Sequence, residues 1–245
     1  MALDQNDKLK APHKARPLRV IDLCTGTGCI PLLLHALLAP HFQLEITGVD
    51  ISLPALRLAQ KNLEHNLQLG QLTHSAATSI CFHRADVLGH EDDDLIPSVE
   101  TILKTQSIRS PPDQHSGYDL LISNPPYISQ MEFCNGTTAR SVRRFEPKLA
   151  LVPPHLGFEK EDCRPEDIFY HRILTLAIKL RAKITVVECG DISQANRVVA
   201  LHKRIASGES GQFSAEVWPS QERDLAQNGF HVTDGSRGVI IQRLP

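Results

Sequence analysis

The chain has 245 residues, a length that suits one α/β domain with or without a small appendage. Its composition, 41% hydrophobic and 22% charged, is ordinary for a globular protein, and its net charge of -2 lacks the positive excess that non-specific nucleic-acid binding requires. The six cysteines form no C-x-x-C pair, which argues against a zinc ribbon or a dithiol redox motif. No apolar stretch is long enough for a transmembrane helix, so no membrane partner is expected.

The N-terminal segment 1–17 is polar and contains acids and two prolines. It has the features of neither a secretory signal nor an Arg-rich transit peptide, and we expect a flexible lead-in with no targeting function. A single domain is expected over 18–245. An apolar run over 18–23 predicts its first buried strand, and the long apolar segment 29–39 predicts a core helix.

Strand-like and helix-like segments then alternate along the chain. Strands are predicted over 44–50, 79–83, 118–123 and 183–190, and helices over 53–67, 166–181 and 192–205. This alternation predicts an α/β fold: a doubly wound, mostly parallel seven-stranded sheet with helices on both faces.

Three segments depart from the alternation. The β-rich segments 214–218 and 238–244 have no strong helix between them, so they are expected to form an antiparallel hairpin at the C-terminal edge of the sheet. Residues 88–116 form a polar, acidic insertion that is long for a loop and could hold a short helix over 95–104. Residues 128–165, rich in proline, glycine and charge, are expected to be irregular.

A glycine-containing turn, Cys24-Thr25-Gly26-Thr27-Gly28, follows Asp22 in the first predicted strand and leads into the first helix. The glycines allow close backbone approach, and the N-terminus of the helix attracts a carboxylate or a phosphate. The turn is no P-loop, and Pro31 occupies the position where the dinucleotide fingerprint needs its third glycine. Asp22 suits an ammonium group or an ordered water. The turn and the acid together therefore suit an amino-acid ligand.

Two further acids follow the next two predicted strands. Asp50 could accept hydrogen bonds from both hydroxyls of a ribose. Asp86 could accept from an adenine amino group, with Val87 supplying a backbone N–H and an apolar contact. Each has a structural alternative, such as Asp50 helping to cap the helix that begins near Ser52. Their order along the chain predicts an S-adenosylmethionine site, with S-adenosylhomocysteine as the product.

The sequence Asn124-Pro125-Pro126-Tyr127 directly follows the fourth predicted strand, at the end where open α/β sheets bind ligands. The carbonyls of Asn124 and Pro125 could hold both hydrogens of a planar NH2 group, so that the nitrogen lone pair points at the methyl group of a donor that Asn124 also contacts. Tyr127 could stack on the acceptor or face the sulfonium ion. We assign these residues to catalysis and, with Pro126, to substrate binding. The structural alternative is a proline-rich turn.

The chain resembles class I S-adenosylmethionine-dependent methyltransferases of the HemK type, the release-factor glutamine methyltransferases, over roughly residues 18–244. The segments that carry the resemblance are the donor loop Asp22-Leu23-Cys24-Thr25-Gly26-Thr27-Gly28, the substrate motif Asn124-Pro125-Pro126-Tyr127, Phe145-Glu146-Pro147 with Ala150-Leu151-Val152, and Glu188-Cys189-Gly190. The resemblance implies a Rossmann-like fold. It also implies methyl transfer to the side-chain amide nitrogen of the glutamine in a Gly-Gly-Gln motif.

The resemblance also implies a partner and a location. The partner is a peptide chain release factor, nucleic acid is not expected as a direct substrate, and we expect a monomer. The insertion at 88–116 suggests a eukaryotic, mitochondrial branch, with the cytoplasm as the alternative location. The family's N-terminal helical domain is expected to be absent, since the core begins within about twenty residues. Cys24 stands where the family often has glycine, and we expect that position not to need a positive φ.

Two other functions remain open at this stage. Asn-Pro-Pro-Tyr also occurs in methyltransferases that act on exocyclic amines of RNA or DNA bases. A third possibility is a non-catalytic binding protein that retains the fold. A small basic group follows the motif and could contact a release factor or RNA or be a solvated loop: Arg140, Arg143, Arg144 and Lys148.

Overall fold

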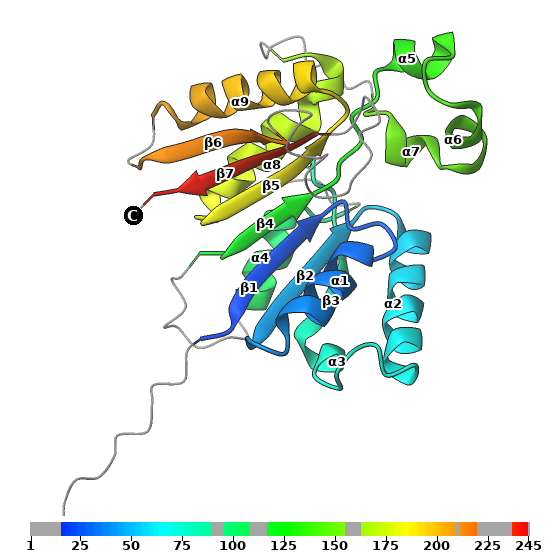
Figure 1. Cartoon of the computed structure of the whole chain (residues 1–245), viewed down its shortest axis with the longest axis vertical. Coiled ribbons are helices and arrows are strands. Elements are labelled where there is room, and N and C mark those ends of the chain that lie inside the picture. The colour runs from blue at the N-terminus through cyan, green and yellow to red at the C-terminus, as the bar shows by residue number, and fades with distance from the viewer. Residues whose placement is uncertain are drawn as a thin grey trace, which may run out of the picture.

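A computed structural model describes residues 16–89, 96–107, 117–154, 163–208, 211–219 and 237–244. Its strands form one seven-stranded sheet in the order β3-β2-β1-β4-β5-β7-β6 (Figure 1). The strands are β1 (Leu18–Leu23), β2 (Leu44–Asp50), β3 (Ile80–Arg84), β4 (Leu120–Ser123), β5 (Ile184–Cys189), β6 (Phe213–Trp218) and β7 (Arg237–Arg243). β1 to β5 pair in parallel, and β7 pairs antiparallel with both β5 and β6. The predicted fold class and the antiparallel C-terminal hairpin are confirmed.

Helices connect the parallel strands. They are α1 (Cys29–Leu38), α2 (Leu53–Gln68), α3 (Ala76–Ser79), α4 (Val99–Ser107), α5 (Gln130–Asn135), α6 (Arg140–Phe145), α7 (Lys148–Leu151), the 3-10 helix η1 (Pro165–Asp167), α8 (Ile168–Lys179) and α9 (Ile192–Ala206). Among the described helices, none has the length and apolar character needed to cross a bilayer.

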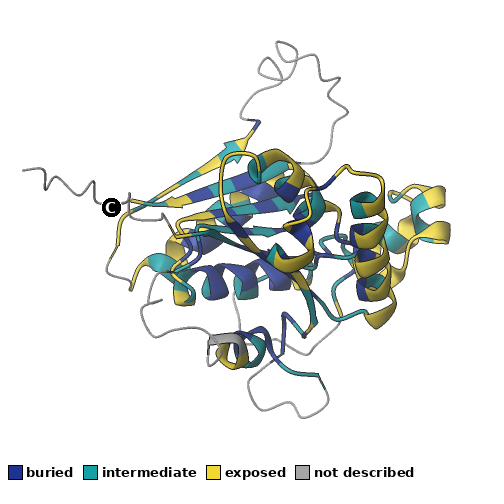
Figure 2. Cartoon of the chain, turned by 90° about the horizontal axis from the view of Figure 1, so that it is seen from below, coloured by how far each residue is buried: buried dark blue, intermediate teal, exposed yellow. Residues whose placement is uncertain are grey.

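Alternating side chains of the strands build two separate cores, one on each face of the sheet. In β1, Ile21 and Leu23 belong to one core, whereas Val20 belongs to the other. The larger core packs against α4, α8 and α9, and the smaller one packs against α1, α2 and α3. Figure 2 shows buried residues along the strands and on the inner sides of helices, with exposed residues outside. The molecule is therefore a three-layer sandwich, and the central strands β1 and β2 are buried at consecutive positions, as helices on both faces require.

The strand order reverses between β1 and β4, because β1 continues to β2 on one side while β4 and β5 extend the sheet on the other. At such a switch point the loops at the carboxyl ends of the two strands diverge and leave a crevice. The glycine turn follows β1 and the Asn-Pro-Pro-Tyr motif follows β4, so the topology brings both to this crevice.

Two helix starts follow their local sequence. The Ser52 hydroxyl accepts from the backbone N–H of Ala55 at 3.4 Å, and Pro54 lies in the first turn of α2, where a missing N–H costs no hydrogen bond. Asp191 caps α9 by accepting from the backbone N–H of Gln194 at 2.6 Å. Both helices begin within a residue of the predicted ranges 53–67 and 192–205, although the cap of α2 is Ser52 and not Asp50.

The prediction that 128–165 is irregular is wrong in part, because α5, α6 and α7 lie within it. Ser129 and Glu132 form a reciprocal capping box at the start of α5, a signal that the sequence contained. Figure 1 shows these short helices beyond the carboxyl ends of the parallel strands. The helix expected over 95–104 lies a few residues later, as α4. Most of the predicted lead-in and much of the 88–116 insertion lie outside the described residues.

Candidate active site

A cavity of about 380 Å³ opens at the carboxyl ends of β1, β2 and β4. Seven of the residues predicted from the sequence line it: Cys24, Gly26, Asp50, Asp86, Val87, Asn124 and Pro126. The other predicted site residues are not part of this lining: Asp22, Thr25, Thr27, Gly28, Pro125 and Tyr127. The structure thus joins the turn after β1, two of the three acids and the start of the motif in one cavity.

The turn after β1 is held in a left-handed conformation at three positions, with φ of 61° at Cys24, 54° at Gly26 and 80° at Gly28. The expectation that Cys24 needs no positive φ is therefore wrong, and a side chain occupies a backbone conformation that favours glycine. A Cβ on Gly26 would meet no atom within 4 Å, so the backbone there is open to a ligand. A Cβ on Gly28 would lie 2.9 Å from the ring of Phe82, so glycine there allows close packing.

Asp50 is fixed by two backbone hydrogen bonds. The N–H of Gly26 donates to Oδ2 at 2.7 Å, and the N–H of Ser52 donates to Oδ1 at 2.8 Å. Each oxygen keeps a second lone pair, so the carboxylate can still accept two hydroxyl groups. Asp50 therefore connects the glycine turn to the β2 end, and the side-chain cap of α2 comes from Ser52 instead.

The loop after β3 forms another wall of the cavity. The N–H of Leu88 donates to Asp86 Oδ1 at 2.9 Å, which orients that carboxylate. The guanidinium group of Arg172, on α8, donates to the carbonyls of Val87 at 3.0 Å and Gly89 at 3.1 Å. Sequence analysis did not identify Arg172, because nothing local links it to a loop 85 residues earlier.

Asp22 is fully buried in β1, and neither of its carboxylate oxygens has a hydrogen-bond partner among the described residues. Burial, with a smaller contribution from the negative charge of Asp50, raises its pKa to about 7, although the nearby Thr25 hydroxyl acts in the opposite direction. An unpartnered buried carboxylate favours a cation or a water nearby. The buried Asp22 carboxylate, together with the open backbone at Gly26, fits the ammonium end of an amino-acid ligand such as S-adenosylmethionine.

Asn124 is exposed at the cavity, whereas Pro125 and Pro126 are buried. Within the described ranges the Asn124 carboxamide makes no hydrogen bond, so its carbonyl and NH2 are available to a ligand. Tyr127 points elsewhere: its hydroxyl donates to Glu188 Oε1 at 3.1 Å, and its ring lies where a Cβ on Gly190 would approach it to 3.2 Å. The structure therefore connects Tyr127 to the end of β5.

The segment after α6 completes the cavity wall. Pro147, Leu149 and Ala150 line it, together with Phe169 from α8. Phe145 is 79% exposed and does not line the cavity. The Phe-Glu-Pro resemblance therefore identified a segment that contacts the site, although only its proline does so directly.

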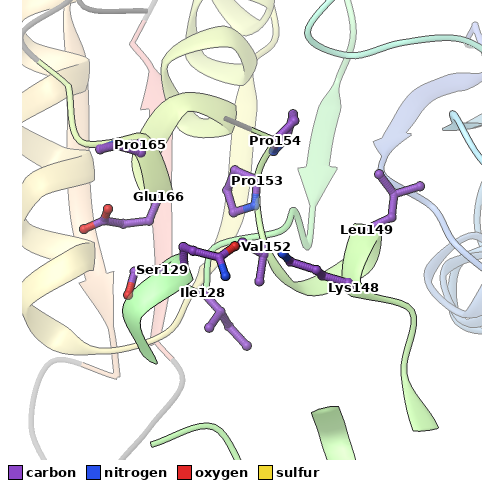
Figure 3. Close-up of a pocket in the computed structure, with 10 residues that line it drawn as sticks. Ile128, Ser129, Lys148, Leu149, Val152, Pro153, Pro154, Pro165 and Glu166 are labelled. Carbon is purple, nitrogen blue, oxygen red and sulfur yellow. The ribbon is translucent and has the colours of Figure 1, made fainter. Parts of the chain in front are cut away.

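A second cavity of about 360 Å³ adjoins the first, and both are lined by Leu149 and Pro154. Figure 3 shows Lys148 and Glu166 on opposite sides of this second cavity, with Ser129 and Ile128 below Glu166 in this view. Ile128, the residue that directly follows the motif, lines this second cavity, so the cavity lies next to the end of the motif. Among the described residues, no group of three His, Cys, Asp or Glu side chains could hold a metal ion.

Known proteins resemble this chain in sequence and in fold. No family model matches the chain. A Schizosaccharomyces pombe protein is named probable MRF1 mitochondrial N(5)-glutamine methyltransferase mtq1. It is 38% identical over an aligned length of 247 residues, which covers 97% of this chain. A Chlorobaculum tepidum release factor glutamine methyltransferase is 35% identical over 57% of this chain. The chain spans 63% and 37%, respectively, of the lengths of these two proteins.

A solved METTL16 methyltransferase domain superposes with a TM-score of 0.52 at 14% identity, over 94% of this chain and 61% of that one. At this identity the superposition shows the fold alone. The chain has the fold of a class I methyltransferase, and over nearly its whole length its sequence is similar to a protein named as a glutamine methyltransferase.

Proposed function

We propose that this protein transfers a methyl group from S-adenosylmethionine to the side-chain amide nitrogen of the glutamine in the Gly-Gly-Gln motif of a mitochondrial release factor. One observation carries the proposal: a single strand-end cavity contains Asp50, Asp86 and the free carboxamide of Asn124. The 38% identity to a protein named as a mitochondrial glutamine methyltransferase supports both the acceptor and the location.

The donor side of the cavity has a residue for each part of an adenosyl amino acid. The backbone at Gly26 can approach the amino-acid end, with Asp22 as the buried acid nearby. Asp50 can accept the ribose hydroxyls, and Asp86 and Val87 can bind the adenine. When bound, the donor supplies a methyl group on a positively charged sulfur.

The acceptor side works by position. The carbonyls of Asn124 and Pro125 can accept the two hydrogens of an amide NH2, which aims the nitrogen lone pair out of the amide plane. Displacement at a methyl group is in-line, so this orientation lowers the entropic part of the barrier. The same oxygens stabilise positive charge that develops on the nitrogen. No general base is assigned, because the proton can leave to water after the methyl group has bonded.

The direct test is incorporation of labelled methyl groups into a mitochondrial release factor. We expect incorporation to be lost when the glutamine of its Gly-Gly-Gln motif is replaced by alanine. Asn124→Ala should lower kcat by about a hundredfold or more, as removal of a single positioning or charge-stabilising group does in other enzymes. Asn196→Ala is the matched control, since Asn196 is exposed on α9 and distant in sequence from the motif.

Other outcomes would favour the alternatives. Label in RNA or DNA, with none in the release factor, would favour a base amine as acceptor. The basic side chains of α6 would then be the first candidates for contacts with the phosphate groups of the nucleic acid. Folded protein that shows no heat of binding with S-adenosylmethionine would favour a non-catalytic binding protein.

A further inference from the structure

A buried glutamine lies between the motif and the rest of the fold. Gln194, near the start of α9, is 4% exposed. Its Oε1 accepts from the backbone N–H of Gly190 at 2.8 Å, and its Nε2 donates to the backbone carbonyl of Tyr127 at 3.2 Å and to Asp167 Oδ1 at 3.0 Å. Both amide hydrogens and the oxygen are therefore engaged by groups of three separate segments.

The orientation of this amide is set by its partners. Rotating it by half a turn would place Nε2 against the N–H of Gly190, and would place Oε1 against the carbonyl of Tyr127 and the carboxylate of Asp167. Asp167 is in turn held by Arg197, whose Nε and Nη2 donate to its two oxygens at 2.6 and 3.0 Å. This bidentate pair fixes the acceptor that fixes Gln194.

The backbone position of Tyr127 restricts the conformation of the motif residues that precede it. The rings of Pro125 and Pro126 fix φ at about -65°, so few backbone dihedrals between Asn124 and Tyr127 can rotate freely. Further bonds hold the same end: the Tyr127 hydroxyl donates to Glu188, and the N–H of Ile128 donates to the carbonyl of Leu151 at 2.9 Å. A contact that fixes the Tyr127 carbonyl therefore also limits where the carbonyls of Asn124 and Pro125 can point.

We propose that Gln194 is a positioning residue for the acceptor: through its hydrogen bond to the Tyr127 carbonyl it holds Asn124-Pro125 in the orientation that grips the substrate amide. The inference rests on the proposed function of that motif. Gln194 does not line either cavity, so it acts through the motif and not on the substrate. Neither the motif nor the sequence resemblance identified it.

Two variants separate this role from simple stabilisation. Gln194→Met keeps the approximate volume and removes every side-chain hydrogen bond. The double variant Gln194→Glu/Asp167→Asn keeps the total charge of the cluster, the bond to Gly190 and a bond between positions 194 and 167. It removes the donor to the Tyr127 carbonyl and one of the two acceptors of Arg197, so Asp167→Asn alone is its matched comparison. Asn196→Asp, an amide-to-acid change at an exposed position of the same helix, is the control.

For both variants we expect kcat toward the release factor to fall by about tenfold to a hundredfold, as a misplaced acceptor predicts. KM for the release factor and the affinity for S-adenosylmethionine should be unchanged, and kcat of the double variant should be lower than that of Asp167→Asn, which removes the same acceptor of Arg197. Wild-type kcat in the double variant, or a loss of activity that parallels the unfolded fraction, would overturn the inference.

Hydrogen exchange at the Ile128 amide gives a readout that does not need activity. We expect faster exchange in both variants and unchanged exchange in Asn196→Asp. If wild-type protein methylates no release factor, the proposed function fails, and this exchange still decides the positioning role. Exchange at Ile128 that matches wild type in the double variant would overturn it.

Discussion

Asp22 carries a carboxyl group in surroundings that disfavour its negative charge. Its pKa is raised to about 7 by burial and by Asp50, against 3.8 in an unfolded chain. Between these values the folded protein holds a proton at Asp22 that the unfolded chain releases. The contribution of Asp22 to stability is therefore fully present below about pH 4 and is lost as the pH rises toward 7.

The first prediction concerns the pH dependence of donor binding. A cationic ammonium group near Asp22 favours its ionised form, so binding should release a proton below pH 7. The affinity for S-adenosylmethionine should then rise by up to about tenfold per pH unit as the pH is raised from about 5 toward 7. Calorimetry in buffers of different ionisation enthalpy measures the released proton, and Asp22→Asn should abolish both effects. A flat affinity profile in wild-type protein would place the ammonium elsewhere.

At the scale of single residues, the sequence predicted what local chemistry requires. The acids at the ends of β2 and β3 and the asparagine at the end of β4 all line the cavity, because side chains that follow parallel strands meet at one edge of the sheet. Cys24 shows the limit of that reasoning. Its left-handed backbone belongs to a turn in which Gly26 and Gly28 are also left-handed, and the residue type at position 24 does not reveal that conformation.

At the scale of elements, α8 supports the loop after β3 through one side chain. Arg172 binds both oxygens of Glu100, at 2.8 and 2.7 Å, while it also donates to the loop carbonyls. Glu100 is 4% exposed. Burial acts to raise its pKa, but hydrogen bonds, including those from Arg172, outweigh burial and leave the pKa lowered. The ion pair therefore joins α4, α8 and a wall of the candidate donor site.

The second prediction follows from this arrangement. Arg172→Met should destabilise the fold by about 3 kcal/mol, the lower end of the range for a broken buried ion pair, because Lys179 still donates to Glu100 at 3.2 Å. It should also weaken S-adenosylmethionine binding, because the carbonyls of Val87 and Gly89 lose their donor. Adding Glu100→Leu should restore most of the stability but not the affinity. Denaturant titration and calorimetry measure the two quantities, and recovery of both in the double variant would contradict a role in supporting the loop.

Elements were predictable in proportion to how local their causes are. The starts of α2 and α9 follow from their caps and from periodic apolar residues, and both were predicted. The six-residue helices α5 and α6 are too short to be stable alone, so neither periodicity nor propensity identifies them. The contacts of Arg172 and Gln194 with the site span 85 and 67 residues, and no pattern along the chain indicates them.

At the scale of the whole molecule, β7 completes the sheet between β5 and β6. Val239 and Ile241 from this strand are 0% and 4% exposed in the larger core, which also contains α8 and α9. β7 is therefore an interior strand of the sheet that contributes to the larger core, whereas its hairpin partner β6 lies at the edge. The anchors of Tyr127 on β5 and α9 belong to this same half of the molecule.

The third prediction tests how far the stability of the fold depends on the core residues of β7. Ile241→Ala should lower the free energy of unfolding by about 2–5 kcal/mol, the range for a buried aliphatic residue. Ile184→Ala is the matched control on β5; because Ile184 is 38% exposed, the cost there should be about 1 kcal/mol or less. Denaturant unfolding followed by circular dichroism measures both. Equal losses at the two positions would show that the β7 side of the core is not close-packed.

The position of β7 also has a consequence for how the protein is made. The ribosome synthesises β5 before β6 and β7, but the neighbour of β5 is β7, the strand that appears later. Until then β5 presents unpaired backbone groups along one side, and unpaired strand edges invite association with other chains. During synthesis the nascent chain therefore passes through a stage in which β5, the strand that anchors Tyr127, can pair with another chain. We expect chaperones to protect the nascent chain at that stage.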